Sequence, residues 1–344
     1  MQSMSTPPLA VGIVGYGYMG QIRRRTVDDH PELELAGICD PVLEPGSDSV
    51  HARVFPTYQG LVGASMDVVF VCTPNCVAPE VVIYGLEHGC HIFCEKPPGR
   101  NLGDIKRIIA AEKAHPELRL IFGFNHGHHP GIVDAKAIVD SGSLGRILWV
   151  RGVYGKSGGN DFEKSWRNDP QVSGGGILLD QGIHMLDLFR YFCGDFVEAM
   201  GMTTTAFWNV AVEDNAFVML RSSDGVLAQL HSSATLWKHT FRLEIGLENG
   251  YLVVSGLLSK TGSYGRETLL IGRKPARGEK VALGNPREET TYYDTDLSWD
   301  VQVNHLVECI RDNRPVSDST SLDALKVMEI CEEVYRQEAL RRRL

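Results

Sequence analysis

The stretch that decides the fold is Gly15-Tyr16-Gly17-Tyr18-Met19-Gly20, which follows the apolar run Leu9–Val14 and opens an amphipathic segment. Its glycines have the GxGxxG spacing at a strand-to-helix junction, the setting in which this pattern binds a dinucleotide. Gly15 permits a tight turn, Gly17 lets a pyrophosphate approach the backbone, and Gly20 allows the helix to pack closely. The helix N-terminus would offer free N–H groups to the phosphates. We therefore expect residues 15–20 to bind a dinucleotide.

A carboxylate beyond the second apolar run indicates which dinucleotide binds. Asp40 follows Leu33–Cys39 and lies twenty residues after Gly20, where a carboxylate can bind both hydroxyls of the adenosine ribose. Its charge would repel the 2′-phosphate of NADP, and no arginine follows before Arg53. We therefore expect NAD as the cofactor. The alternative is that Asp40 only starts the turn at Pro41.

Short apolar runs alternate with amphipathic segments along the first third of the chain. Near-continuous apolar strands separated by helices are typical of a parallel sheet that is covered on both faces. We therefore predict an N-terminal Rossmann domain, an α/β fold with a doubly wound parallel sheet, over residues 1–125. The predicted strands are Leu9–Val14, Leu33–Cys39, Val68–Cys72, His91–Cys94 and Leu120–Phe124, and the predicted helices include Pro79–Glu87 and Leu102–Ala114.

The pattern then changes to longer segments in which apolar and polar residues alternate. Phe241–Leu247 alternates in this way and is followed by Asn249-Gly250, a typical hairpin turn. Asp224-Gly225 likewise joins Phe217–Leu220 to Val226–Leu230. Strands with one apolar face are typical of antiparallel sheets. Residues 126–344 are therefore predicted to form an α+β substrate domain with an open, largely antiparallel sheet.

Helical patterns begin and end this second domain. Asp134–Ser141 is the first of them. Near the end of the chain, Thr320 and Asp323 have capping-box spacing, and apolar residues then recur every three positions, at Leu322, Leu325, Met328 and Cys331. This closing helix could pack back on the first domain.

Charge and hydropathy exclude two classes of partner. The 344-residue chain has a net charge of −9, which would repel a nucleic-acid backbone. Its longest apolar runs, such as Met66–Cys72, are far shorter than a bilayer span, so we expect no membrane insertion. The first twenty residues contain no Lys or Arg, which argues against a secretion signal. We expect a cytoplasmic protein.

Cysteines and histidines invite a metal interpretation, which we do not favour. The eight cysteines are expected to be reduced core residues. Cys72/Cys76 and Cys90/Cys94 have a spacing found in some zinc sites, but no His-x3-His partner follows. The loop that carries His126, His128 and His129 has no carboxylate or cysteine close by in sequence. We expect no metal, and these histidines could instead contact a substrate.

Three polar residues have spacings that suit alcohol and ketone chemistry. Lys96, in Glu95-Lys96-Pro97, comes directly after the strand His91–Cys94 and so lies at the carboxyl end of a sheet strand, where ligands bind in doubly wound folds. Asp180 and His184 follow the run Gly174–Gly176 and lie one helical turn apart on the same face.

An alcohol must lose its hydroxyl proton as its carbon gives a hydride to a nicotinamide. His184 suits the role of base because histidine titrates near neutral pH. Lys96 can stabilise the alkoxide-like oxygen, or it could be the base if burial and the nicotinamide charge favour its neutral form. Asp180 would orient one of them and compensate its charge. Alternatively, Lys96 is a solvated turn residue, His184 a core residue and Asp180 a helix cap.

Taken together, the motifs resemble the Gfo/Idh/MocA oxidoreductase family over nearly the whole chain. The resemblance rests on the GYGYMG turn, Cys72-Thr73-Pro74-Asn75, Glu95-Lys96-Pro97, Gly123-Phe124-Asn125, Trp166-Arg167 and the GGGxxxDxGxH run at 174–184. It implies a Rossmann domain that carries NAD or NADP, and a second domain whose open sheet supports the substrate and often a dimer or tetramer interface. It also implies a sugar, cyclitol or nucleotide sugar as substrate.

The resemblance assigns roles to individual residues. The implied catalytic residues are Lys96, Asp180 and His184. The implied cofactor contacts are residues 15–20 and Asp40, with Cys72, Thr73, Pro74, Asn75, Glu95, Lys96, Asn125, Trp166 and Arg167. The implied substrate contacts are Lys96, His126, Tyr154, Lys156, Asn160, Arg167, Asp180 and His184. Two departures from the family pattern are Ala78, where a histidine is frequent, and His126-Gly127, where basic residues are frequent.

We therefore expect an NAD-dependent enzyme that interconverts a secondary alcohol and a ketone on a sugar-like molecule, as a homodimer or homotetramer through the C-terminal sheet. Two alternatives use the same fold. A hydrolase could retain NAD and oxidise a sugar transiently while cleaving a glycosidic bond. A sensor could bind the dinucleotide without activity, but it would not need Lys96, Asp180 and His184 together.

Overall fold

The computed structural model describes residues 7–44, 51–259, 262–275 and 284–341, and the chain divides into two compact units. The first unit comprises Met1–Phe124, Gln171–Gly174 and Trp299–Leu325. The second unit comprises Asn125–Pro170, Gly175–Ser298 and Lys326–Leu344. The segment Trp299–Leu325, which falls within the predicted second domain, is thus part of the first unit.

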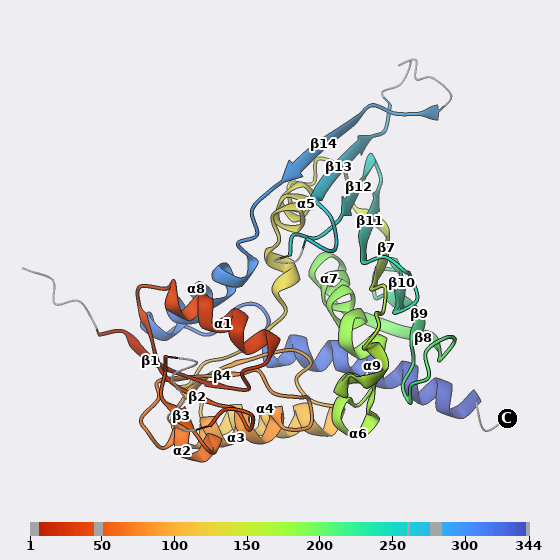
Figure 1. The fold of residues 1–344 in the computed structure, drawn as a ribbon. Coiled ribbons are helices and arrows are strands. Elements are labelled where there is room, and N and C mark those ends of the chain that lie inside the picture. The colour runs from red at the N-terminus through yellow and green to blue at the C-terminus, as the bar shows by residue number, and fades with distance from the viewer. Residues whose placement is uncertain (1–6, 45–50, 260–261, 276–283, 342–344) are drawn as a thin grey trace, which may run out of the picture. The chain divides into compact units, whose positions relative to one another are not determined.

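A six-stranded parallel sheet forms the centre of the first unit (Figure 1), in the order β3-β2-β1-β4-β5-β6. The strands are β1 (Leu9–Val14), β2 (Leu33–Cys39), β3 (Val54–Phe55), β4 (Val68–Val71), β5 (His91–Cys94) and β6 (Leu120–Phe122). The helices on its two faces include α1 (Tyr18–Asp28), α2 (Tyr58–Val62), α3 (Ala78–Glu87), α4 (Leu102–Ala114) and α8 (Ser298–Arg311). The predicted doubly wound Rossmann sheet is confirmed.

The core of this unit follows from the two-residue period of its strands. Val11 and Ile13 of β1 share one buried cluster with Val27 of α1 and with Val303 and Leu306 of α8. Successive side chains on a strand point to opposite faces, so every second residue of β1 contributes to this layer. Both faces of the sheet are largely covered, which is why most residues of its strands are apolar.

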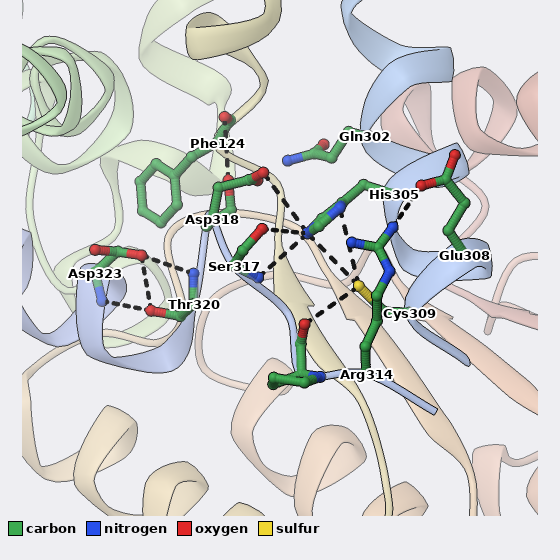
Figure 2. A network of polar contacts seen from close by, with 12 residues as sticks. Phe124, Gln302, His305, Glu308, Cys309, Arg314, Ser317, Asp318, Thr320 and Asp323 are labelled. Atoms are coloured by element: carbon green, nitrogen blue, oxygen red, sulfur yellow. Dashed lines mark hydrogen bonds and ion pairs between the residues drawn. The ribbon is translucent and has the colours of Figure 1, made fainter. Parts of the chain in front are cut away.

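The end of this unit is held by a polar network between α8 and the segment that follows it (Figure 2). The imidazole Nε2 of His305 lies 3.6 Å from Asp318 Oδ2 and accepts a hydrogen bond from the backbone N–H of Ser317. Thr320 and Asp323 exchange backbone-to-side-chain hydrogen bonds at the start of α9 (Ser321–Arg341). The predicted capping box is therefore confirmed.

An eight-stranded sheet forms the second unit, in the order β14-β13-β12-β11-β7-β10-β9-β8. Every neighbouring pair is antiparallel except β7 and β10. The strands are β7 (Ile147–Gly155), β8 (Phe196–Thr204), β9 (Asn215–Ser222), β10 (Leu227–Ser233), β11 (Thr240–Leu247), β12 (Gly250–Ser255), β13 (Glu267–Arg273) and β14 (Glu288–Tyr293). The predicted open, largely antiparallel sheet is confirmed.

One face of this sheet is covered and the other is open (Figure 1). Helices α5 (Pro130–Asp140) and α7 (Ile183–Cys193) lie on the covered face. Along β9, Val218 and Leu220 are buried, whereas Phe217 and Met219 alternate with them and are about half exposed. Apolar side chains therefore stand on both faces of the strand.

Candidate active site

The glycine turn of the first unit has the backbone that a dinucleotide requires. Gly15 has φ +88°, and a Cβ atom there would lie 2.6 Å from the carbonyl oxygen of Cys72. A Cβ on Gly20 would lie 2.1 Å from the Gly15 carbonyl oxygen, whereas one on Gly17 would meet nothing within 4 Å. Gly17 caps α1 without a side-chain hydrogen bond to the helix N-terminus. The turn therefore packs tightly against backbone atoms at Gly15 and Gly20, and it is open at Gly17. The open space at Gly17 fits a bound pyrophosphate.

Asp40 stabilises the turn after β2, as its alternative role predicts, and its carboxylate can still accept hydrogen bonds from a ligand. Its Oδ2 accepts from the backbone N–H of Tyr16 at 2.6 Å, and its Oδ1 accepts from that of Val42 at 3.0 Å. The carboxylate thus anchors the glycine turn to the end of β2. A carboxylate has about four acceptor positions, so these two bonds leave room for ribose hydroxyls.

The segment after β4 offers a second polar surface in the first unit. The Thr73 hydroxyl is buried and has no hydrogen-bond partner in the part of the chain that the structure describes. The Asn75 amide donates to the backbone oxygen of Ser173 at 2.7 Å, so its orientation is fixed. Burial raises the pKa of the Cys72 thiol, which disfavours its thiolate form. Pro74 lies between them in the same turn.

The turn that carries Lys96 is held by a buried ion pair. Arg23, on α1, is fully buried and donates from Nε to Glu95 at 2.6 Å and from Nη2 to Gln302 at 3.0 Å. Its guanidinium lies between the rings of Phe93 and Trp299, 4.0 and 4.6 Å from their centroids. The helix that begins at the glycine turn is therefore tied to the residue that precedes Lys96.

In the second unit, Asp180 and His184 lie on one continuous helical run. Asp180 is in a π-helical turn, Leu178–Gly182, and His184 is in the first turn of α7. Single π turns inside helices are rare and occur often at functional sites. No side chain caps either segment, so Asp180 does not serve as the helix cap that was its alternative role.

A buried glutamate fixes the start of this run. Glu213 accepts hydrogen bonds from the backbone N–H groups of Gly176 at 2.8 Å and Leu178 at 3.0 Å, and from the Tyr335 hydroxyl at 2.8 Å. Burial raises the pKa of Glu213, and these hydrogen bonds oppose the rise. A Cβ on Gly176 would lie 2.1 Å from the Glu213 carbonyl oxygen, which explains a glycine at this position.

Two cations of the second unit contact Asp180. The ammonium of Lys156 lies 2.6 Å from Oδ2, and Nε of Arg167 lies 3.2 Å from Oδ1. The side chains of Lys156 and Asp180 are less than one-fifth exposed, and that of Arg167 is 41% exposed. Arg167 also stacks on Trp166, with 4.4 Å between its Cζ and the ring centroid. Both expected substrate contacts therefore hold the carboxylate in place.

His184 stacks on a second histidine. The rings of His126 and His184 are nearly parallel, with centroids 3.8 Å apart. His126 Nε2 lies 3.0 Å from the hydroxyl of Tyr154, and burial raises the pKa of Tyr154 well above its usual value. Gln181 donates to Tyr264 at 2.8 Å, and burial raises the pKa of Tyr264 to about 12. Both phenols are therefore protonated at neutral pH and can donate or accept hydrogen bonds.

His129 of the same loop lies beside His126, with 5.6 Å between their ring centroids, and contacts a buried carboxylate. His129 is buried and its Nδ1 lies 2.9 Å from Glu267 Oε2, whose partner Oε1 accepts from the backbone N–H of Gly131. This carboxylate comes from far along the chain, which is why the loop alone gave no sign of it. In the described ranges, no group of three or more His, Cys, Asp and Glu side chains could hold a metal ion.

The structure groups most of the predicted substrate contacts within the second unit. Lys156 and Arg167 contact Asp180, and Tyr154 and His184 contact His126; the two groups meet on the helical run that carries Asp180 and His184. Asn160 lies exposed in a turn, and Asn125 donates to Ser298 Oγ at 2.9 Å. Lys96 and the predicted cofactor contacts before residue 125 belong to the first unit.

Several supporting residues escaped the sequence analysis. Arg23 bonds to Glu95 and Glu213 to the backbone before Asp180, while Tyr264 packs against the ring of Tyr154 and is held by Gln181. Their partners are distant in sequence, so no spacing reveals them. The acidic pair Glu213-Asp214 directly before a strand was the one available signal, because acidic residues next to an apolar strand call for buried partners.

Two family models match the chain in succession. Residues 9–124 match the oxidoreductase family with an NAD-binding Rossmann fold, and residues 132–253 match the Gfo/Idh/MocA C-terminal domain. These matches confirm the resemblance that the motifs indicated and the NAD-binding character of the first unit.

Several of the similar proteins are dehydrogenases. The levoglucosan dehydrogenase of Pseudarthrobacter phenanthrenivorans is 34% identical over 212 residues, which are 57% of this chain and 54% of that protein. This chain thus spans about half the length of that relative. The inositol 2-dehydrogenase of Corynebacterium glutamicum is 22% identical over 334 residues, which are 94% of this chain and 92% of that protein.

A solved dehydrogenase structure has a similar fold. The structure of a levoglucosan dehydrogenase in complex with NADH and levoglucosan matches with a TM-score of 0.86 at 20% identity, over 96% of this chain and 97% of that one. This likeness extends the shared fold over both units. No helix in the described part of the chain is long and apolar enough to cross a membrane.

Proposed function

The chain belongs to the Gfo/Idh/MocA oxidoreductase family, and from this premise we propose that it is an NAD-dependent dehydrogenase that interconverts a secondary alcohol and a ketone on a sugar or cyclitol. The observation that carries the proposal is the cluster in the second unit, where Asp180 is held by two cations and His184 stacks on His126. The names of the relatives, which act on levoglucosan and inositol, support the substrate class.

The proposed reaction transfers a hydride and a proton. NAD bound at the glycine turn would supply the acceptor for the hydride that the alcohol carbon loses. His184 takes the hydroxyl proton, since its imidazole can accept one near neutral pH. Lys96 donates a hydrogen bond to the oxygen as it gains negative charge, which lowers the barrier to ketone formation. In the alternative assignment Lys96 takes the proton, and His184 donates to the oxygen.

Asp180 is proposed to position these groups through charge. Its carboxylate compensates the positive charge that appears when a neighbouring base takes the proton. Lys156 and Arg167 keep the carboxylate in one orientation, because each binds a different oxygen. His126, Tyr154, Lys156, Asn160 and Arg167 remain the candidates for binding the hydroxyl groups of the substrate.

For the cofactor, we propose that residues 15–20 hold the pyrophosphate and that Asp40 binds the adenosine ribose. The open space before Gly17 and the uncapped start of α1 support this assignment. The remaining cofactor contacts are proposed at residues 72–75, Glu95, Lys96, Asn125, Trp166 and Arg167. Asp40 favours NAD over NADP, because its charge repels a 2′-phosphate.

We also propose a homodimer or homotetramer that forms through the open face of the second sheet. Phe217 and Met219 on β9 and Met202 on β8 are between 45% and 62% exposed on adjacent strands. A contiguous apolar surface of this kind usually marks an interface. Light scattering of the wild type and of Phe217→Asp tests this assignment, and a monomeric wild type would contradict it.

The function is tested with a panel of free sugars, inositols, sugar phosphates, uronic acids and nucleotide sugars in the presence of NAD. We expect stoichiometric NADH with one polyhydroxylated class, and NADH consumption with the matching ketone. Cleavage of a glycoside without net NADH and without added NAD would support the NAD-retaining hydrolase instead. Binding without any product would support the sensor.

Two variants test the assignment of the reacting groups. Lys96→Ala and His184→Ala should each lower turnover by roughly a hundredfold or more, because acid-base or oxyanion assistance is lost. NAD binding, measured by titration, should largely survive in both. Near-normal turnover of either variant would remove that residue from the mechanism.

A further inference from the structure

We propose that four aromatic residues of the second unit form a subsite for the second ring of a glycosidic substrate, either another sugar or an aryl group. The four residues, which we call the aromatic shelf, are Phe162, Phe207, Trp208 and Trp237. This inference rests on the proposed function, since it extends the substrate from a single sugar to a glycoside. The shared chemistry of the two ring types is a flat apolar face that can stack on an aromatic side chain.

The shelf begins at the residue that holds Asp180. The ammonium of Lys156 lies 2.6 Å from Asp180 and 5.6 Å from the ring centroid of Phe162. Phe162 in turn contacts Trp208, with 4.9 Å between ring centroids. A ligand that reaches Asp180 would therefore have aromatic surface next to it on the Lys156 side.

The outer half of the shelf exposes large apolar rings to solvent. Phe207 is 62% exposed and Trp237 is 59% exposed. Their rings meet edge to face with centroids 4.8 Å apart, and Phe207 packs against Trp208 in the same way at 5.1 Å. Isolated exposed apolar residues are common, but a contiguous aromatic group usually marks a binding site.

The shelf is rigid before any ligand binds. Asp214 is fully buried, and its carboxylate accepts from three successive backbone N–H groups, those of Ala206, Phe207 and Trp208, at 2.8 to 2.9 Å. Burial alone would raise the pKa of Asp214, but these hydrogen bonds hold it below its usual value. The loop that carries two shelf residues is thus fixed by a charge, and a ligand has little ordering cost to overcome.

The two tryptophans are also held in defined positions. The indole N–H of Trp208 donates to the backbone oxygen of Ala234 at 2.9 Å, and a Cβ on Gly158 would lie 2.0 Å from its ring. Trp237 has φ +55°, a left-handed backbone that a bulky side chain rarely adopts. Strain of this kind persists mainly at functional sites.

Sheet topology gathers the shelf at one edge and separates it from the open face. Its residues lie in the loops after β7, β8 and β10, and because these three strands run in the same direction their ends meet at one edge. Lys156 follows β7 at that same edge. Self-association through the flat face would use side chains such as Phe217, within β9, and would not need the loops.

The test compares substrates of different length once the panel has identified a sugar that yields NADH. The wild type should prefer the phenyl glycoside and the disaccharide of that sugar over its methyl glycoside by about fivefold to tenfold in kcat/KM, as stacking of one ring allows. Phe207→Ala and Trp237→Ala should each abolish most of that preference through KM, while activity on the methyl glycoside stays within about twofold.

Controls keep the result specific. Trp237→Phe should retain part of the preference for the phenyl glycoside and the disaccharide, because an aromatic ring remains. Phe217→Ala, on the open face, should leave that preference unchanged. Quenching of tryptophan fluorescence by phenyl β-glucoside and cellobiose, without NAD, gives a readout that does not need turnover.

The outcomes separate this inference from the proposed function. If the panel yields no NADH but the glycosides quench fluorescence in wild type and not in Phe207→Ala, which keeps every tryptophan, the dehydrogenase proposal fails and the subsite stands. If NADH forms but the wild type treats methyl and phenyl glycosides alike, the subsite is wrong and the dehydrogenase proposal stands.

Discussion

Replacing Lys156 by methionine should show how much the ion pair between Lys156 and Asp180 contributes to the free energy of unfolding. Methionine keeps most of the apolar stem and removes the ammonium, which lies 2.6 Å from Asp180 Oδ2. Asp180 then keeps its ion pair with Arg167, at 3.2 Å. The substitution therefore removes the ammonium of Lys156 without creating a cavity.

The expected magnitude follows from distance and burial. At 2.6 Å the attraction between the two charges is about 6 kcal/mol for an effective dielectric constant of about 20. Desolvation and side-chain ordering offset most of it, so a charge-assisted hydrogen bond contributes about 1.5–3 kcal/mol net. Since the two side chains keep 19% and 18% of their exposure, we expect about 1–2 kcal/mol for the coupling between Lys156 and Asp180.

The assay is a double-mutant cycle in urea with Lys156→Met, Asp180→Asn and the combined variant, followed by intrinsic fluorescence. A matched control is Lys164→Met, because Lys164 pairs with Asp161 at 2.9 Å but both side chains are 80% exposed. That control should change the free energy of unfolding by less than about 0.5 kcal/mol. A coupling energy between Lys156 and Asp180 no larger than the change in unfolding free energy caused by Lys164→Met would refute the reasoning.

Three further predictions concern the first unit. Asp40→Ser should narrow the preference for NAD over NADP by about tenfold or more, because the substitution removes the negative charge that repels the 2′-phosphate. Equal wild-type affinities for the two cofactors, measured by titration, would contradict the assignment. Gly17→Ala should fold normally yet bind NAD at least about tenfold more weakly. Gly20→Ala should instead lower the temperature of thermal unfolding, because a Cβ on Gly20 meets protein atoms and one on Gly17 does not. Equal unfolding temperatures for the two variants would contradict this difference. Arg23→Met should cost about 3–5 kcal/mol in urea unfolding by stranding the buried carboxylate of Glu95, and adding Glu95→Gln should recover part of the loss; no recovery would exclude charge as the cause.

The sheets were predictable where burial imposes a period on the sequence. Val68–Val71 and the three residues after His91 in His91–Cys94 are apolar because helices cover both faces, and this alone indicates a parallel sheet. Val54–Phe55 escaped prediction because a two-residue edge strand has no period. Glu288–Tyr293 escaped because it is a polar edge strand with no apolar face.

The site was predictable only where its residues share one element. Asp180 and His184 lie on a single helical run, so their spacing placed them together, although no local pattern indicated the π turn that carries Asp180. The stacking of His126 on His184 and the anchoring by Glu213 join segments that are far apart in the chain. Such contacts depend on how the elements pack, and a single sequence does not record that.

The charges around Asp180 also bear on what the site can stabilise. Lys156 and Arg167 bring two positive charges to the carboxylate of Asp180. An oxygen that becomes negative as its carbon loses a hydride is stabilised by a fixed positive environment. The second cation therefore suits a transition state with alkoxide character, and loss of Arg167 should lower kcat more than it raises KM.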